Sequence, residues 1–446
     1  MSFVPHTEED RARMLRALGL SNADQLFEEV RAALPPGQVP EIPAASESDL
    51  SHELWEIARL NGRPDRTACF RGAGAYEHYI PAAIPHLLSR GEFFTAYTPY
   101  QAEISQGTLQ AMYEFQTMVC ELFGLDVANA SMYDGASALA EAALMAMRVT
   151  RKRRLLVTAA LHPHWLQVLR TYTANVDADI VQIPTQDGVT PPDGVAEFLD
   201  EDTAAVIIQN PNVFGLIEPI REVGSLLADR PALFIAAAYP IALGLLATPG
   251  EAGADIAVAE GQPLGIPLSF GGPYLGLLAT RMEHVRQMPG RISGVSCDSS
   301  GRRGYVLTLQ AREQHIRRER ATSNICSNQA LCALAATVYL ALMGPVGFRT
   351  TAERSFAAAH ELARKLAALP GCSLAFDAPF FNEFVLELPV PAEDVARELW
   401  GHDIISGLPL GRWWPERRNQ MLFCATEITT DAGVERLMAA MKEALP

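Results

Sequence analysis

Short apolar runs alternate with segments of helical spacing between about residue 126 and residue 280. The apolar runs lie at residues 126–131, 153–159, 179–184, 204–209, 231–239, 255–261 and 274–280, and clear helical patterns lie at 135–148 and 162–174. Runs of this length between helical segments are typical of a mainly parallel sheet that is covered on both faces. A chain of 446 residues has room for such a large α/β domain and a smaller one.

The flanking segments predict three parts along the chain. Residues 1–100 read as a helical extension with an interface loop, with helical spacing at 7–19 and 21–34 and a polar, proline-containing stretch to about Ser51. Residues 101–345 form the large domain with its connecting helices. Residues 346–446 form a small α+β domain. The helices and strands expected outside the alternating region are helices at 105–124, 305–319, 327–344 and 347–369 and strands at 372–377, 380–388 and 419–426.

Bulk composition argues against several classes of partner. The formal net charge of −16 repels nucleic acid and anionic lipid, so neither is expected to bind. We find no window of eighteen apolar residues without a charge or a proline, and the acidic N-terminal stretch does not resemble a signal peptide. We therefore expect no membrane span and a cytoplasmic location.

The cysteine and histidine patterns predict neither disulfides nor a metal site. Seven cysteines are scattered without a C-x-x-C pair, which fits buried, reduced thiols better than a disulfide framework. His162 and His164 are close in sequence, but no Cys or carboxylate stands at ligand spacing from them. We expect no bound metal.

A large parallel sheet followed by a small α+β domain is the layout of the aspartate-aminotransferase-like enzymes that use pyridoxal phosphate (PLP), the PLP-dependent transferase fold type I. A PLP site of this kind needs a helix N-terminus for the phosphate, an acid for the pyridine nitrogen and a lysine for the aldimine. The turn that opens the helix at Gly135 has the shape of an anion site. The alternative is an ordinary strand-to-helix turn capped by Asp134 or Ser137.

The acid and the lysine are missing. Ala236, Ala237 and Ala238 occupy the positions where the acid is expected. The position expected for the lysine reads Gln262, Pro263, Leu264, Gly265, and the three lysines of the chain are Lys152, Lys365 and Lys442. Arginine does not form imines in its place because its pKa is too high. This chain by itself is not expected to form a Schiff base with PLP or to be active alone.

Five stretches of the sequence resemble the glycine dehydrogenase (decarboxylating) family, the P-protein of the glycine cleavage system. They span Phe70–Pro85, Gly91–Ala142, Gln209–Glu218, Gly253–Gly276 and Arg312–Leu331, and the likeness covers essentially the whole chain. The family occurs as one long chain with two homologous halves or as two subunits, and only the second half or subunit carries the PLP lysine. This sequence resembles the first, lysine-free subunit. It departs from the family pattern at Ala102, where a proline is usual.

The resemblance implies an activity and a set of partners. The activity is decarboxylation of PLP-bound glycine, release of CO2 and transfer of the aminomethyl group to the lipoyl arm of the H-protein. The partners are a homologous PLP-bearing subunit 2, in an α2β2 heterotetramer, and the lipoylated H-protein. PLP is then held by the partner subunit and not covalently by this chain.

The loop before the helix at 105–124 is the main candidate for function. Its tyrosines and polar side chains stand on a backbone that Pro99 partly restrains, which suits recognition across an interface, although an exposed turn whose tyrosines cover the core edge explains them equally well. With the resemblance, we expect five of its residues to contribute to the partner's active site: Tyr97, Tyr100, Glu103, Ser105 and Gln106.

Two further positions are candidates by analogy with the family and the fold. Thr322, Ser323 and Asn324 are candidates for cofactor contacts at a subunit boundary, with helix capping by Ser323 or Ser327 as the alternative. His162 stands where related folds place a side chain that stacks on the cofactor ring.

Three functions remain in competition. The chain is a catalytically incomplete enzyme subunit, or a scaffold or regulatory pseudoenzyme that only stabilises a PLP enzyme. An independent enzyme with another nucleophile is the third, but no G-x-S-x-G or similar motif supports it.

Overall fold

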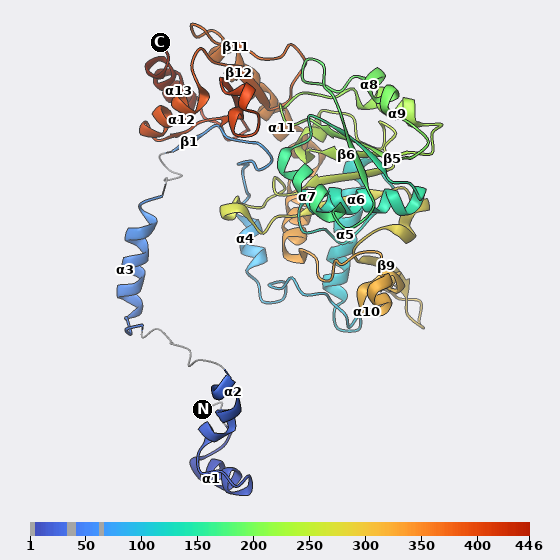
Figure 1. The fold of residues 1–446 in the computed structure, drawn as a ribbon, viewed down its shortest axis with the longest axis vertical. Helices are drawn as coiled ribbons and strands as arrows, with labels where there is room; N and C mark the ends of the chain where they lie inside the picture. Colours follow the sequence, from blue (N-terminus) through green and yellow to red (C-terminus); the bar gives the residue numbers. More distant parts are fainter. Residues whose placement is uncertain (1–4, 34–41, 62–66) are drawn as a thin grey trace. The chain divides into compact units, whose positions relative to one another are not determined.

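The computed structural model describes residues 5–33, 42–61 and 67–446 (Figure 1). The alternating segments form one seven-stranded sheet. The strand order is β2-β8-β7-β6-β5-β3-β4. β7, β6, β5, β3 and β4 run parallel, and β8 is antiparallel to both of its neighbours. This confirms the mainly parallel sheet. The strand bounds are β2 Val127–Ala128, β3 Arg154–Thr158, β4 Asp179–Ile183, β5 Thr203–Asn210, β6 Leu233–Ala238, β7 Ile256–Glu260 and β8 Gly276–Thr280.

Helices cover both faces of this sheet. Alternate strand residues such as Leu155 and Ile207 pack with α6 (Gly135–Thr150) and α7 (Pro163–Thr173). The residues on the other face pack with α8 (Pro192–Phe198) and α9 (Ile220–Leu227), or, beside β7 and β8, with α5 (Gln106–Phe123) and α11 (Ala330–Ala367). Strands buried on both faces explain why the runs are apolar without alternation. α5 spans Gln106–Phe123 and ends at Gly124, which has the left-handed backbone (φ 66°) that favours glycine.

A second, smaller sheet carries the C-terminal region. It is antiparallel in the order β11-β12-β15-β14 and shares an apolar core with α12 (Ala392–Gly401) and α13 (Asp431–Ala444). Near it, β1 (Ala68–Cys69) pairs in parallel with β13 (Ile404–Ile405), so the chain just after residue 67 lies beside the C-terminal region. The strand bounds are β11 Ser373–Leu374, β12 Glu383–Glu387, β14 Leu408–Pro409 and β15 Gln420–Cys424.

The helices predicted at 327–344 and 347–369 are one element, α11 (Ala330–Ala367), with a break at Gly344 (φ 57°, ψ −177°) before Pro345. α11 is long and apolar enough to cross a membrane by length and composition, and 28% of its most apolar window is buried. Every eighteen-residue window of α11 contains Pro345 or a charged residue, so this helix does not contradict the absence of an apolar window without either. Core helices of soluble proteins meet the same criterion, and Ala333, Ala336 and Tyr339 of α11 lie in the core beside α5.

The helix predicted at 305–319 is wrong. Residues 303–308 form β10, which pairs with β9 (Ile292–Cys297) in an antiparallel hairpin. Within the predicted range only Gln314–Arg317 (α10) is α-helical, because Leu309 and Arg318 both have positive φ and interrupt the backbone. The missed signal is the turn at 298–301, closed by a hydrogen bond from the N–H of Gly301 to the carbonyl of Asp298.

The chain forms two compact units, residues 1–63 and 64–446. The first contains α1 (Glu8–Ala17), α2 (Glu28–Ala33) and α3 (Glu47–Ala58), and none of its described residues, 5–33 and 42–61, is buried. α3 begins at Glu47 and is capped by Ser46, so the polar stretch is shorter than predicted; its part at 34–41 lies outside the described residues. The division into 1–100, 101–345 and 346–446 stays a prediction.

The remaining short elements are α4 Ala83–Leu88 and 3-10 turns at Ala23–Phe27, Pro240–Gly244, Ser269–Gly271, Met282–Gln287, Gln310–Arg312, Arg318–Arg320, Leu410–Arg412 and Pro415–Arg417.

The seven cysteines, all in the described part of the chain, are free thiols, as their spacing predicts. Their predicted burial holds fully only for Cys424. Cys297 and Cys326 are exposed and the other four are half-buried. The two exposed thiols lie in the hairpin and in the segment before α11, both outside the apolar runs of the sheet.

Candidate functional site

Two places in the larger unit gather the candidate residues. The first is the sheet-edge cavity, at the carboxyl ends of the parallel strands, which is where ligands bind in open α/β sheets. Its volume is about 30 Å³, enough for no more than a water-sized molecule. Its lining residues are Gly74, Tyr76, His162, Trp165, Gln209, Pro211, Ala238, Tyr239, Glu260, Asn382 and Glu383.

The N-terminus of α6, predicted as an anion site, is taken up by side chains of the chain itself. Asp134 accepts a hydrogen bond from the N–H of Ser137, and the Ser137 hydroxyl oxygen accepts one from the N–H of Asp134, which confirms the capping alternative. The N–H of Gly135 donates to Oε2 of Glu260 at 2.9 Å. A Cβ at Gly135 would come within 2.5 Å of the Trp165 ring, so no open space lies over this helix end.

Glu260 ends β7 and is held by backbone donors from three segments. Besides Gly135, the N–H groups of Gln262 (3.0 Å) and Leu275 (3.1 Å) donate to its Oε1. Burial raises the pKa of Glu260 to about 7, against the lowering effect of these three donors. Sequence reasoning missed Glu260, although it is the one carboxylate at the end of an otherwise apolar strand.

A second buried carboxylate, Glu383 of β12, closes the opposite side of the cavity. It accepts hydrogen bonds from the N–H of Ala73 (2.6 Å) and from the hydroxyl of Tyr76 (2.8 Å). A Cβ at Gly72 would lie 2.2 Å from Oε1 of Glu383, so the backbone and the carboxylate are in tight contact. Burial raises the pKa of Glu383 to about 7.

These residues do not fit PLP. Ala236–Ala238 lie buried on β6 and offer no carboxylate, as predicted. Gln262, near the expected lysine position, uses its amide to bind the backbone of Tyr76 and Ile266. The cavity is too small for a pyridine ring, and its lining offers a phosphate two carboxyl groups and no lysine or arginine. The three lysines lie in or just after helices and do not line it.

His162 lies at the edge of the same cavity as the N-cap of α7. Its Nε2 is 2.9 Å from the carbonyl of Ala73, and its Nδ1 accepts from the N–H of His164. Its ring packs edge-on against Trp413, with the centroids 5.0 Å apart, and burial lowers the pKa of His162 to about 4. The ring is therefore neutral and already has partners. Among the described residues, no three His, Cys, Asp or Glu side chains gather as a metal site.

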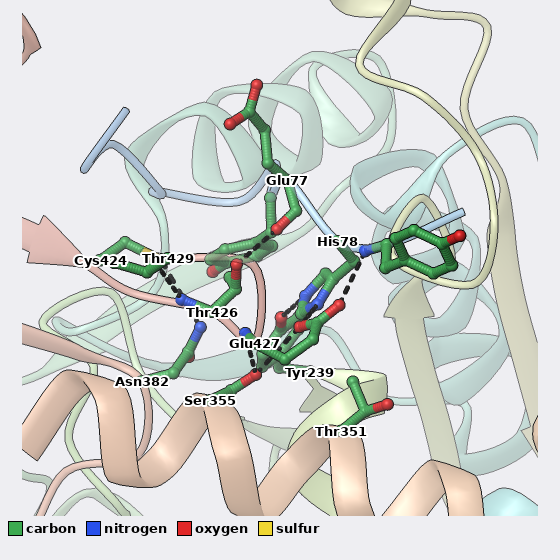
Figure 2. A network of polar contacts seen from close by, with 12 residues as sticks. Glu77, His78, Tyr239, Thr351, Ser355, Asn382, Cys424, Thr426, Glu427 and Thr429 are labelled. Carbon is green, nitrogen blue, oxygen red and sulfur yellow. Dashed lines mark hydrogen bonds and ion pairs between the residues drawn. The ribbon is translucent and has the colours of Figure 1, made fainter. Parts of the chain in front are cut away.

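Behind the cavity, a polar network joins segments that are far apart in the sequence (Figure 2). Nδ1 of His78 lies 2.6 Å from Glu427, which follows β15, and Nε2 lies 2.5 Å from the hydroxyl of Tyr239, which follows β6. Ser355 of α11 donates to Glu427, and so does the N–H of Tyr79. Burial opposes ionisation of Glu427, but its contacts with His78 and the N–H of Tyr79 outweigh this and hold its pKa below the usual value.

The second place is the loop that carries the five predicted residues. Tyr97 is 69% exposed and Tyr100 is 44% exposed, and their rings meet edge-on. Glu103 is exposed. Ser105 is the N-cap residue of α5 by position, but its side chain makes no capping hydrogen bond. Gln106 binds the N–H and the carbonyl of Tyr305 in β10 with its side-chain amide, so it joins the loop to the hairpin.

A buried arginine, which the sequence did not single out, holds this loop from below. Arg291, 2% exposed, donates from Nε to the hydroxyl of Thr98 (3.1 Å) and the carbonyl of Cys326 (3.0 Å), and from Nη2 to the hydroxyl of Tyr100 (2.6 Å). Its charge is paired with Glu313, which is 6% exposed. His315 packs edge-on against Tyr100. We call residues 97–106 and 322–328, with Arg291, Glu313 and His315, the Tyr100 surface.

The three candidates for cofactor contacts, Thr322, Ser323 and Asn324, lie in the Tyr100 surface and have different surroundings. The Ser323 hydroxyl donates to Glu141 of α6 and accepts from the N–H of Ile325, the N–H of Thr322 donates to the carbonyl of Arg312, and Asn324 is exposed. Neither Ser323 nor Ser327 caps α11, whose N-cap is Gln329. The structure therefore brings the two predicted segments together through Arg291, and it gives Gln106 and Ser323 partners within the chain.

Comparisons with known proteins identify the family and the fold of the chain. The family description "Glycine cleavage system P-protein" matches residues 1–441. The probable glycine dehydrogenase (decarboxylating) subunit 1 of Desulforamulus reducens is 51% identical over 442 residues, with 99% of each chain covered, and that of Moorella thermoacetica is 50% identical over 443 residues, also with 99% of each covered.

A crystal structure of glycine decarboxylase (P-protein) of the glycine cleavage system, in inhibitor-bound form, superposes with a TM-score of 0.91 at 43% identity, with all of both chains covered. Sphingosine-1-phosphate lyase of Burkholderia pseudomallei gives a TM-score of 0.68 at 16% identity, with 93% of this chain and 94% of the lyase covered, which speaks for the fold alone. The expected PLP-dependent transferase fold type I is confirmed. The chain belongs to the glycine cleavage system P-protein family.

Proposed function

We propose that this chain is the cofactor-free subunit of a glycine decarboxylase and works with a homologous subunit that carries PLP. Glycine loses its carboxyl carbon as CO2, and the remaining aminomethyl group passes to the lipoyl arm of the H-protein. The lipoyl disulfide takes up the electron pair left by decarboxylation: one sulfur bonds the aminomethyl carbon, and the other becomes a thiol. PLP, held by the partner, supplies the electron sink for this step.

The observation that carries the proposal is the contrast within one fold. The sheet-edge cavity, where a fold of this type would hold a cofactor, is closed by Glu260 and Glu383. The relatives are named as subunit 1 of glycine dehydrogenase, a name that calls for another subunit. A chain with this fold and no room for PLP contributes to the reaction only through a partner.

The Tyr100 surface is the part of this chain that we assign to the partner's active site. Tyr97, Tyr100 and Glu103 are exposed there, while Arg291 and Gln106 fix the backbone and side chains beneath them. Rigid aromatic and polar side chains on a supported loop suit recognition across an interface. Asn324 and Thr322 stand beside them as further candidates for contacts with the partner's cofactor.

We further propose that the two subunits form a permanent α2β2 assembly. Permanent interfaces typically bury more than roughly 2,000 Å² in total and close by two-fold symmetry. Co-expression is expected to yield one species that survives dilution. Separate elution of the two chains at micromolar concentration would count against the assembly.

A scaffold role is the second candidate, and one observation favours it. Gln106 and Ser323, two of the predicted site residues, already bond within the chain. In that case the Tyr100 surface only holds the partner and contributes nothing to turnover.

Glycine–bicarbonate exchange by the assembled complex separates the two roles. We expect Tyr100→Phe and Glu103→Gln to lower exchange by about 10²–10³ if the groups stabilise developing charge, with normal assembly on a sizing column and normal PLP content. Ser105→Ala, in the same loop, tests whether that hydroxyl also takes part. The matched control is Tyr172→Phe on α7, which removes a hydroxyl from a partly exposed tyrosine outside both candidate places. Unchanged exchange in all three loop variants would favour the scaffold.

A further inference from the structure

Arg291 has an unusual environment for a residue outside the sheet-edge cavity. It is one of the largest fully enclosed side chains of the larger unit, and its guanidinium reaches four partners from three segments of the chain. Burying a guanidinium is costly unless its charge is paired and its donors are used. Glu313 supplies the charge, and the loop and the segment before α11 supply the other acceptors.

The geometry at Tyr100 has a directional consequence. A guanidinium has only donors, so in the 2.6 Å contact Nη2 donates and the phenol oxygen of Tyr100 accepts. The hydroxyl hydrogen of Tyr100 is then left to donate to another acceptor. The guanidinium carbon also lies 4.8 Å from the centre of the Tyr100 ring, so the cation packs against the face of the ring and restrains its position.

The same guanidinium ties two segments together. Its Nε serves both the Thr98 hydroxyl and the Cys326 carbonyl, and the hydroxyls of Thr98 and Ser327 are 3.1 Å apart. The loop at 97–106 and the segment at 322–328 are more than 200 residues apart in sequence, and Arg291 lies between them. Any movement of one segment must break a charge-assisted hydrogen bond or carry the other segment along.

We propose that Arg291 is a positioning residue: it orients the Tyr100 hydroxyl so that its hydrogen is free to donate outward. It also holds the loop that carries Tyr100 against the segment at 322–328. This inference rests on the proposed function, because the acceptor that Tyr100 addresses is an oxygen of the substrate or of the partner's active site. Arg291 itself is buried and does not reach the partner. Its effect on turnover therefore passes through Tyr100.

The test is a double-mutant cycle in the assembled complex, with kcat and KM for glycine measured in the complete reaction. Arg291→Lys keeps the charge beside Glu313 but loses the planar fork that serves Tyr100, Thr98 and Cys326 together. We expect Arg291→Lys to lower kcat at least about 10-fold, and Tyr100→Phe to lower it by about 10²–10³. On the Tyr100→Phe background, Arg291→Lys is expected to have almost no further effect on kcat.

The outcomes separate the inference from the function on which it rests. If Tyr100→Phe leaves kcat unchanged, the shared active site fails. If Tyr100→Phe lowers kcat and Arg291→Lys multiplies that loss in the double variant, the shared site stands and the positioning role of Arg291 is overturned. Tyr172→Phe on α7, outside both candidate places, is the matched control and is expected to leave kcat unchanged.

A second measurement keeps the inference testable if Arg291→Lys assembles poorly. Glu313→Gln keeps Arg291 and its bonds to the loop while removing the paired charge. We expect it to lower the melting temperature of the complex with a smaller loss of kcat than Arg291→Lys. A loss of kcat in Glu313→Gln as large as that in Arg291→Lys would show that general destabilisation, and not the orientation of Tyr100, sets the rate.

Discussion

The sheet-edge cavity and the Tyr100 surface are both rich in polar side chains, but they use them in opposite ways. In the cavity, Glu260 and Gln262 bind backbone groups, and Glu383 binds the N–H of Ala73 and the hydroxyl of Tyr76. The cavity volume that remains is about 30 Å³. In the Tyr100 surface, the buried Arg291 donates its hydrogen bonds to the loop and to the segment before α11, and Tyr97 and Glu103 stay exposed. A ligand could enter the cavity only by breaking these internal hydrogen bonds, whereas a partner can contact the exposed loop without breaking any.

The largest contrast between the two regions is expected in thiol reactivity. Cys326 belongs to the Tyr100 surface and is exposed, while Cys424 is buried behind the cavity, where burial raises the pKa of its thiol. Maleimide labelling of the isolated chain, followed by mass spectrometry, is expected to modify Cys326 at least about 10³-fold faster, because Cys424 reacts only after unfolding. Binding of the partner subunit should protect Cys326. Fast labelling of Cys424 would show that the cavity region opens readily.

Loss of the Arg291 charge should have the largest effect on stability. Arg291→Met leaves Glu313 buried without its cation, which we expect to cost about 3–5 kcal/mol of the free energy of unfolding. Denaturant melts of the isolated chain measure this. The double variant Arg291→Met/Glu313→Leu removes both charges and is expected to recover much of the loss, and a double variant as unstable as the single one would contradict a role for charge pairing.

The stability of the cavity region should depend on pH, because Glu383 is buried there. Burial raises the pKa of Glu383 to about 7 from its usual value near 4.5, so the folded chain keeps a proton that the unfolded chain releases in this range. Its contribution to stability is complete below about pH 4.5 and is lost as the pH rises to about 7.

Glu383→Gln removes this titration, and its amide can accept from the N–H of Ala73 while donating to the hydroxyl oxygen of Tyr76. Relative to wild type, the variant should gain about 1–3 kcal/mol of stability between pH 4.5 and 8. Urea midpoints across that range measure the difference. A difference that does not change with pH would mean that Glu383 ionises normally inside the cavity.

Two neighbouring residues of the loop should give the smallest effects and differ from each other. Gln106→Ala removes the hydrogen bonds to Tyr305 and Ala102, and we expect it to cost about 1–2 kcal/mol. Ser105→Ala removes a side chain that makes no capping bond, and its effect should stay within about 0.5 kcal/mol. Melting temperatures of the two variants in parallel provide the check. Equal losses of melting temperature would mean that the Ser105 hydroxyl also makes a stabilising hydrogen bond.

The sheet could be predicted from the sequence because its strands are buried on both faces and therefore apolar throughout. The helix predicted at 305–319 failed because a local turn and two residues of positive φ override helical spacing. The missing lysine and acid were visible in the sequence, since absence at a known position needs no coordinates. The importance of Glu260, Glu383 and Arg291 was not visible, because it depends in each case on at least one partner that is 22 to more than 300 residues away.

The network around His78 has a consequence for how the chain is made. The hydrogen bond between His78 and Glu427 joins positions 349 residues apart. At roughly 5–20 residues per second, a ribosome needs about 20–70 s to cover that distance. Until Glu427 is made, His78 and Tyr239 lack the carboxylate that completes their contacts. The segment that carries Glu427 thus completes this part of the fold late in synthesis, and a nascent chain that stalls before Glu427 lacks the acceptor for His78, Tyr79 and Ser355.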